Sequence, residues 1–202
     1  MTTMTTTTLG LVGALLVLGC GCPSAPQDTS PGDLAPLPVR DDPLQQTSGT
    51  VPHVQLDIDP DQEVVDELIR RSFLLPDLEN RPTVVSLPGA LGMWLTDEVE
   101  IAHPEVIVEG REFAHIHPDG SLHAPLPVAR AFEVAETGWG ERHPWADDRD
   151  GWEGFVMLFT PRSMEELEVT FQLVVESYNH VTGREEDPAT YVPVDETGDA
   201  GR

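Results

Sequence analysis

The spacing of apolar residues changes several times between residues 51 and 183, and a helical period comes first. Asp59 is expected to cap that helix, and Pro60 suits its first turn, where a backbone N–H would lack a helical partner. The apolar stripe that the helix would bury consists of Val64, Val65, Leu68 and Ile69. We therefore predict a helix that begins at Asp59 and packs one face against the rest of the domain.

Two further helices are predicted later in the chain. Residues 127–136 have a helical pattern, and Gly138 stands where helices commonly end. Residues 163–166, Ser-Met-Glu-Glu, form a capping box at the start of the last helix, which is expected to stop before Gly183. The face that this helix would bury consists of Leu167, Phe171, Val174 and Tyr178.

Short runs of β-branched and apolar residues between the helices predict strands. These runs cover residues 81–87, 91–95, 105–116, 121–126 and 155–159. We expect a hinge at Pro88-Gly89 between the first two, and a hairpin that turns at Glu109-Gly110 in the third. Helices at both ends of a mainly antiparallel set of strands are typical of the α+β class. The sequence therefore predicts a single α+β domain with a mainly antiparallel sheet and flanking helices.

An apolar run at residues 9–19 precedes the predicted domain. The run is too short to span a membrane and has the length of a signal-peptide core. It ends in Val17-Leu18-Gly19-Cys20, which resembles a bacterial lipobox, so we expect Cys20 to become the lipidated first residue of the mature protein. Residues 1–8 carry no arginine or lysine, unlike most signal peptides. Secretion without a lipid and a plain apolar N-terminus are therefore the alternatives.

Composition divides the chain into four parts. Residues 1–20 are expected to be a lipoprotein signal peptide, and residues 21–50, rich in small and polar residues and proline, a disordered tether. The folded domain is expected at residues 51–183, which is long enough for a sizeable core. Residues 184–202 are expected to be a disordered acidic tail. This order predicts attachment to the membrane through a lipid anchor, on the extracytoplasmic side of a bacterial cell envelope.

The formal net charge of the chain is −25, from 36 acidic and 11 basic residues. All the basic residues are arginines, which excludes a Schiff-base lysine and a phosphate loop with its lysine. So acidic a chain lacks the basic patch that nucleic-acid binding requires. The two cysteines are Cys20 and Cys22, so the predicted domain has no cysteine nucleophile, disulfide or cysteine-based zinc site.

Histidines gather in the middle of the predicted domain. Because side chains alternate along a strand, Phe113, His115 and His117 are expected on one face, to which His123 can return after a tight turn. Glu112 would point to the opposite face. Three histidines in this arrangement suit a divalent metal ion or a general base in an apolar cleft. The alternatives are a hairpin fixed by hydrogen-bonded histidines and a cupin site, for which a second motif block is not evident.

Two later segments add polar side chains. Residues 138–144, Gly-Trp-Gly-Glu-Arg-His-Pro, contain two glycines and a proline, so neither a regular helix nor a regular strand is expected. A loop of this kind suits a pocket wall, with apolar area from Trp139 and polar groups from Glu141, Arg142 and His143. A helix end followed by a turn anchored on the tryptophan is the alternative. Arg162 can hold an anionic oxygen, or pair on the surface with the glutamates that follow it.

In their motifs and in the order of these motifs, the segments resemble the luciferase-like domain family, which includes the fungal luciferases. The pattern is Glu-Phe-Ala-His-x-His at 112–117, Ser-Leu-His at 121–123, Gly-Trp-Gly-Glu-x-His-Pro at 138–144, Pro-Arg at 161–162 and an acidic capped helix over 163–178. The upstream stretch, residues 81–95, is similar to bacterial members. The resemblance covers roughly residues 81 to 180.

The resemblance implies an oxygen-dependent oxidoreductase that acts on a small enolic or aromatic compound without an added cofactor, since fungal luciferases oxidise a hydroxylated pyrone with molecular oxygen. Deprotonation of such a compound would fall to one of His115, His117, His123 and His143, and Arg162 would stabilise the anion.

The resemblance also implies residues that bind the substrate, and other functions remain open. Phe113, Trp139 and Glu141 are expected to contact the small molecule. The one cofactor to consider is a divalent metal ion on His115, His117 and His123. A non-catalytic binding module and a metal-binding envelope lipoprotein are the competing functions.

Overall fold

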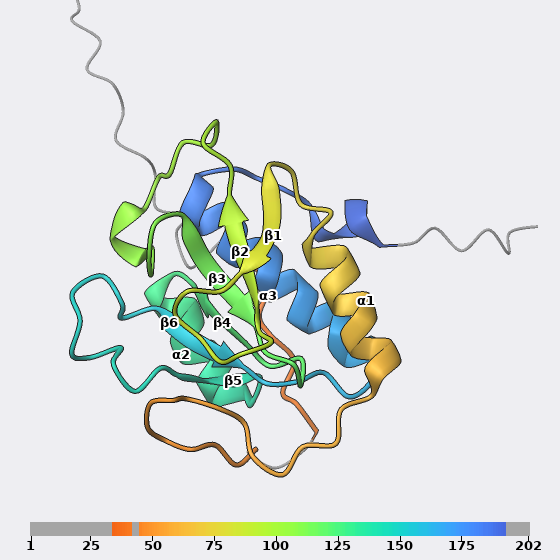
Figure 1. Ribbon diagram of the computed structural model, residues 1–202. Coiled ribbons are helices and arrows are strands. Elements are labelled where there is room, and N and C mark those ends of the chain that lie inside the picture. Colours follow the sequence, from red (N-terminus) through yellow and green to blue (C-terminus); the bar gives the residue numbers. More distant parts are fainter. Residues whose placement is uncertain (1–33, 42–44, 193–202) are drawn as a thin grey trace, which may run out of the picture.

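The computed structural model of the protein describes residues 34–41 and 45–192 (Figure 1). The predicted signal peptide, its Cys20 and the end of the predicted tail from residue 193 lie outside the described residues. Within the described part, no helix is long and apolar enough to cross a membrane.

The described residues form a sheet of six strands, in which every neighbouring pair is antiparallel. The strands are β1 (Leu78–Pro82), β2 (Leu91–Leu95), β3 (Glu112–Ile116), β4 (Leu122–Pro125), β5 (Gly140–Arg142) and β6 (Phe155–Leu158). Their order across the sheet is β1-β2-β3-β4-β6-β5. With the helices described next, this arrangement confirms the predicted α+β class.

In the described residues, three helices accompany the sheet: α1 (Gln62–Ser72), α2 (Val128–Thr137) and α3 (Met164–Thr182). Two short 3-10 helices add to them, η1 (Pro104–Val106) and η2 (Pro188–Tyr191). The predicted caps of α2 and α3 are confirmed, because Gly138 and Gly183 close the two helices in the left-handed region and Ser163 caps α3. The cap of α1 is Asp61 instead of Asp59, since the Asp61 side chain accepts the N–H of Glu63 at 3.0 Å.

One face of the sheet packs against the helices and forms the core. Figure 1 shows α3 crossing behind the strands, with α1 beside it. The sheet contributes Ala114, Ile116, Leu122, Ala124, Val156 and Leu158 to the core. The face of α3 that the sequence predicts as buried is at most 1% exposed, which confirms that prediction. Because side chains alternate along β3 and β4, His115 and His123 lie on the opposite face.

Two strand predictions need correction. Residues 81–87 are not one strand, because β1 ends at Pro82. Beyond it the Thr83 hydroxyl and the Val84 N–H donate to the buried carboxylate of Glu112, at 2.6 and 3.0 Å, in place of a strand partner. In the predicted hairpin 105–116, the first arm contains η1 and a single bridge between Glu109 and Glu112.

The segment 138–144, which was expected to be irregular, contains strand β5. Gly140 makes this pairing feasible, because a Cβ atom at that position would lie 2.3 Å from the carbonyl oxygen of Met157 on β6. The glycine therefore allows a close approach of two backbones, where sequence reasoning treated it as a strand breaker.

Part of the stretch predicted as a tether packs on the domain. Leu37 and Arg40 are 7% and 6% exposed. The Arg40 guanidinium donates to the Thr160 carbonyl at 2.9 Å and to the Glu166 carboxylate at 2.7 Å. The Pro38 carbonyl accepts the indole N–H of Trp139 at 2.7 Å. Residues 34–41 are therefore held on the domain by side-chain contacts that composition does not reveal.

The first residues of the predicted tail also contact the domain. Arg184 pairs with Asp77 at 2.7 Å and donates to the Tyr178 hydroxyl at 2.6 Å. Tyr191, in η2, lies 6.1 Å from the ring of Phe171 on α3. The folded part thus continues past Gly183 to the end of the described residues.

Candidate functional site

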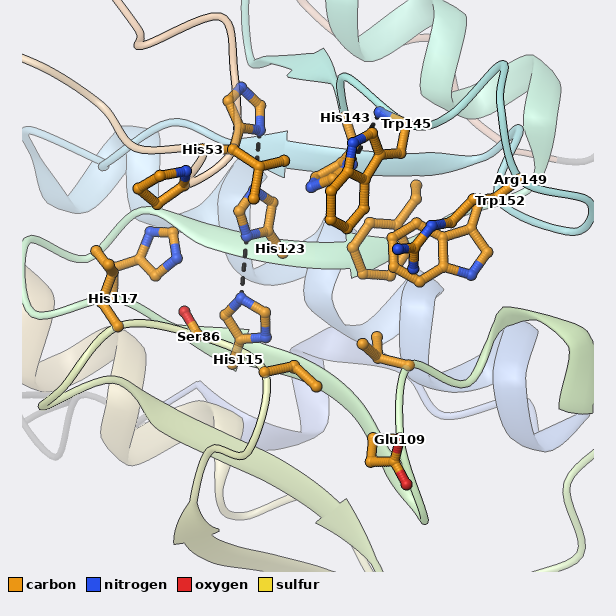
Figure 2. Close-up of a pocket in the computed structure, with 16 residues that line it drawn as sticks. His53, Ser86, Glu109, His115, His117, His123, His143, Trp145, Arg149 and Trp152 are labelled. Carbon is orange, nitrogen blue, oxygen red and sulfur yellow. Dashed lines mark hydrogen bonds between the residues drawn. The ribbon is translucent and has the colours of Figure 1, made fainter.

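A cavity of about 460 Å³ lies on the histidine-bearing face of the sheet (Figure 2). Its volume is in the range of sites for small molecules. One wall consists of His53, His115, His117, His123 and His143, which are all at most 8% exposed. The predicted cluster of histidines is thus confirmed, and it gains one member, His53.

The lining next to His143 is aromatic. Trp145, Trp152 and Phe155 line the cavity, and the rings of Trp152 and Phe155 stack with centroids 4.5 Å apart. The Arg149 guanidinium lies over both tryptophans, 3.9 Å from the ring centroid of Trp145 and 4.6 Å from that of Trp152. A flat ligand would therefore meet aromatic area and a positive charge beside the histidines.

Strand pairing and a tight turn bring three of the histidines together. His115 on β3 and His123 on β4 are direct partners in the register, and His115 Nε2 lies 3.0 Å from His123 Nδ1. His117 follows β3, and a turn closed by the bond from the Gly120 N–H to the His117 carbonyl leads back into β4. Gly120 has a φ of 86°, which favours glycine. The three ring centroids are 4.9 to 5.3 Å apart.

A β-bulge changes which side chains of β3 face the cavity. Met93 pairs with Ala114 but Trp94 pairs with Glu112, so Phe113 is an extra residue in β3. The expected alternation fails at that point. Phe113 packs in the core 6.3 Å from the ring of Tyr178 on α3. The prediction that Phe113 shares the histidine face and Glu112 the other is therefore wrong.

Glu112 instead lies beside the histidines. Its Oε1 is 3.4 Å from His115 Nδ1, and the carboxylate is fully buried. Burial opposes ionisation of this group, but the neighbouring His115 ring and the donors Thr83 and Val84 lower its pKa. A buried negative charge thus stands behind the histidine wall.

His53 joins the cluster from the segment before α1. Its Nδ1 lies 3.0 Å from His123 Nε2, and its Nε2 lies 2.5 Å from the Glu141 carboxylate. No spacing relative to the other histidines predicts this position. His53 lies close to the expected start of the predicted domain, and no local signal in the sequence marks it as a site residue.

The proton of His117 is fixed by its neighbours. The Ser121 hydroxyl donates to Asp119 Oδ1 at 2.7 Å, and the same oxygen lies 2.9 Å from His117 Nδ1. Since the hydroxyl proton is already used, the serine oxygen must accept a proton from Nδ1. His117 therefore presents an unprotonated Nε2. Burial and the neighbouring histidines lower its pKa to about 4, so the ring is neutral at pH 7.

His143 has the opposite tautomer. Its Nδ1 accepts the backbone N–H of Trp145 at 3.1 Å, so the neutral ring carries its proton on Nε2. Burial, with the charges of His53 and Arg149, lowers the pKa of His143 to about 4. At neutral pH this ring is a hydrogen-bond donor, on the same cavity wall as the His117 acceptor.

The remaining predicted site residues lie elsewhere. Trp139 is buried beneath Arg40, away from the cavity lining. Glu141 reaches the cluster only through His53. Arg162 is on the surface, where it pairs with Glu166 at 2.5 Å. The surface alternative for Arg162 is therefore the one observed.

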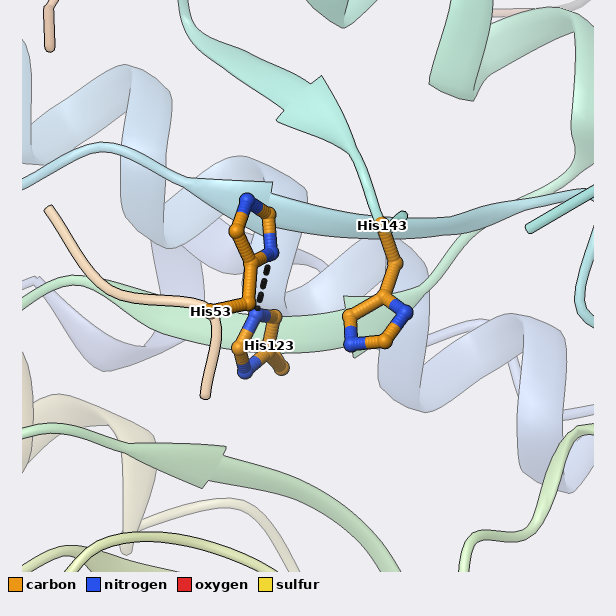
Figure 3. Close-up of side chains that lie close together, drawn as sticks. All are labelled: His53, His123 and His143. Carbon is orange, nitrogen blue, oxygen red and sulfur yellow. Dashed lines mark hydrogen bonds between the residues drawn. The ribbon is translucent and has the colours of Figure 1, made fainter. Parts of the chain in front are cut away.

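Two sets of histidines have ring nitrogens close enough to share a metal ion. One is His115, His117 and His123, and the other is His53, His123 and His143 (Figure 3). In each set, one nitrogen from each ring lies within 4.8 Å of the others.

Comparisons with known proteins point to one family. The profile of the luciferase domain matches residues 110–177, which include β3, the turn, β4 and most of α3. The luciferase of Armillaria mellea is 29% identical over 176 residues, which cover 77% of this chain and 64% of that protein. The luciferase of Neonothopanus nambi is 36% identical over 94 residues, which cover 44% of this chain and 33% of that protein.

The chain thus spans less than two thirds of the length of these relatives. No solved structure matches it. The matched segment carries His115, His117, His123 and His143 on a single cavity wall. This match and these relatives support a luciferase-like domain in the chain.

Proposed function

We propose that the protein is an oxygen-dependent oxidoreductase that acts on a small enolic or aromatic compound in the histidine-lined cavity. The observation that carries this proposal is a cavity of about 460 Å³ that is lined by five histidines and, beside them, by the aromatic rings of Trp145, Trp152 and Phe155. The relatives named luciferase support the enzyme class.

The aromatic rings and the histidines have different roles in such a reaction. The rings of Trp145 and Trp152 would hold the flat substrate, with its hydroxyl group toward His115, His117 and His123. Ionisation of the hydroxyl there makes the conjugated carbon electron-rich. An electron pair of that carbon then forms a bond to molecular oxygen, and the negative charge moves to the outer oxygen atom.

Two groups in the cavity can stabilise these anions. His143 offers its Nε2–H, and Arg149 offers a positive charge beside the tryptophans. Because the pKa of His117 is about 4, a neutral ring there can take a proton only from an acidic hydroxyl. This favours enols conjugated to a carbonyl over simple alcohols.

Oxygen consumption tests the proposal. The purified protein is mixed with a hydroxylated pyrone, a catechol or an enolised diketone, and oxygen uptake is recorded with an electrode. We expect uptake with at least one of these compounds, and its loss in His117→Ala. The matched control is His103→Ala, whose ring stacks on His180 away from the cavity. Binding of these compounds without oxygen uptake would favour the non-catalytic binding module.

We also propose that the protein is a lipoprotein of the bacterial cell envelope, held to the membrane through Cys20 on the extracytoplasmic side. This rests on the apolar run that ends at Gly19-Cys20. Growth with a labelled fatty acid should label the wild type and leave Cys20→Ala unlabelled. Equal labelling of the two proteins would contradict the anchor.

A further inference from the structure

The hydrogen-bond partners around the histidine wall determine where each ring carries its proton. His117 donates Nδ1–H to Ser121, so its Nε2 has a free lone pair. The closest ring nitrogens of His115, His117 and His123 lie within 4.8 Å of one another. Since Nδ1 of His117 is held by the serine, Nε2 is the nitrogen left for this group.

The proton of His123 is set by a chain that begins at Glu141. A carboxylate 2.5 Å from His53 Nε2 requires a proton on that nitrogen, and in the neutral tautomer His53 Nδ1 is then an acceptor. His53 Nδ1 lies 3.0 Å from His123 Nε2, which must therefore donate. The neutral His123 ring then has its lone pair on Nδ1, on the side of His115.

His115 is directed in the same way by Glu112. The carboxylate oxygen 3.4 Å from His115 Nδ1 favours a proton on that nitrogen, which has no hydrogen-bond partner of its own in the structure. The lone pair of His115 is then on Nε2. Consequently, His115 Nε2 and His123 Nδ1 face each other at 3.0 Å with two lone pairs and no proton between them.

Two lone pairs at 3.0 Å repel unless a cation lies between them. A proton would satisfy only these two nitrogens, whereas a metal ion also uses the lone pair of His117. We propose that His115 Nε2, His117 Nε2 and His123 Nδ1 bind a divalent first-row transition metal ion, with zinc as the simplest candidate. Three imidazole ligands suit such ions and leave a coordination position open toward the cavity.

The groups behind the three rings fit this assignment. Metal-binding histidines commonly donate their second ring N–H to a carboxylate or another acceptor, which orients the ring. Here Glu112 stands behind His115, the Ser121–Asp119 pair stands behind His117, and His53 with Glu141 stands behind His123. Each chain of donors thus ends at a carboxylate, and these negative charges favour a cation at the centre.

The second set of histidines does not fit as well. His143 uses its Nδ1 to accept the Trp145 N–H, so its Nε2 carries a proton and cannot bind a metal ion. His53 Nδ1 and His123 Nε2 share one proton between them. We therefore do not count His53 and His143 among the metal ligands, although both are also buried.

The metal site adds to the proposed function. Metal binding itself does not depend on that function, and only the catalytic role of the ion rests on it. A bound cation lowers the pKa of a hydroxyl group that it coordinates. With the ion bound, His117 would be a ligand instead of the base, and the substrate would bind as its anion after releasing the hydroxyl proton to solvent.

Metal binding to the full-length protein tests the assignment directly. The protein is stripped with a chelator and titrated with Co²⁺, followed by visible absorption, and with Zn²⁺, followed by calorimetry. We expect one ion per chain and tetrahedral Co²⁺ bands. His115→Gln and His117→Gln should lose binding, and Asp119→Asn should weaken it by about tenfold, as expected for a residue that orients a ligand.

His143→Asn and His103→Ala are the matched controls, and both should bind the ion as the wild type does. Circular dichroism verifies that each variant is folded, and Ala replaces Gln wherever a Gln variant is not. Absence of stoichiometric binding in the folded wild type would overturn the proposal. So would binding that survives in His117→Gln and is lost in His143→Asn. Oxygen uptake is measured separately, so an inactive protein that binds the ion would contradict only the proposed reaction.

Discussion

His53 Nδ1 lies 3.0 Å from His123 Nε2, which joins the segment before α1 to the middle of the sheet. The segment therefore serves as part of the cavity wall, and the side chain of Glu141 holds its other end. The site is assembled from β3, β4, the start of the domain and the loop after β5.

Arg40 is expected to stabilise the domain from outside the predicted boundary. Its guanidinium is buried and bonded to the Thr160 carbonyl and the Glu166 carboxylate. Arg40→Ala should lower the free energy of unfolding by about 2 kcal/mol, the usual effect of losing a hydrogen bond to a charged group. Urea unfolding measures the change. Arg70→Ala, which removes an exposed pair on α1, is the control and should cost less than about 0.5 kcal/mol.

Gly120 is expected to be essential for the turn between β3 and β4. Its φ is 86°, and a Cβ atom there would lie 2.7 Å from Val65 Cγ2. Gly120→Ala should therefore destabilise the fold by about 2 kcal/mol or more, since strain and a clash add. The control is Gly49→Ala, at a φ of 62° with no atom within 4 Å of its Cβ, which should cost about 1 kcal/mol. Equal losses in the two variants would contradict the packing argument.

His143 is expected to make stability depend on pH between 6.5 and 4. Its pKa is lowered from 6.5 to about 4 in the folded protein, chiefly by burial. As the pH falls through this window, the unfolded chain binds a proton at His143 while the folded ring remains neutral, so stability decreases. His143→Asn keeps an acceptor for the Trp145 N–H and removes the titration. Unfolding measured across the window should show a shallower loss in the variant, and identical slopes would refute the idea.

Ligand binding is expected to change tryptophan fluorescence. Trp145 and Trp152 line the cavity, whereas Trp94 does not. A hydroxylated pyrone or catechol that stacks in the cavity should quench the emission, and Trp152→Phe should remove a large part of the quenching. Trp94→Phe should retain it, and this control is mild because the Trp94 indole N–H has no partner to lose. Retained quenching in Trp152→Phe would place the ligand elsewhere.

Strand periodicity predicted the central part of the site correctly. His115 and His123 share a face because a two-residue period and a tight turn place them as register partners. The same reasoning failed for Glu112 and Phe113, because a bulge depends on how β2 pairs with β3 and leaves no mark in either strand alone. Capping signals located α3 closely, since Ser163 and Gly183 act through bonds within their own neighbourhood.

Long-range contacts account for what the sequence did not reveal. His53 acquires its role from Glu141 and His123, which are 88 and 70 positions away. Arg162 looked like an anion-binding group, but Glu166, one helical turn further on, takes up its guanidinium. Local composition cannot predict the roles of His53 and Arg162. The partners of His53 are distant in the chain, and Arg162 has several neighbouring glutamates that could pair with it.

The bulge in β3 shifts the alternation of side chains between the two faces of the sheet. In a regular strand, residues an odd number of positions apart face opposite sides, yet Glu112 and His115, three apart, face the same side. The inserted residue, Phe113, thus reverses the face of the sheet to which the preceding residues of the strand point. Deleting Phe113 alone would turn Glu112 away from His115 while leaving every other letter of the sequence in place. Along this strand, the count of residues determines the chemistry of the cavity as much as their identity does.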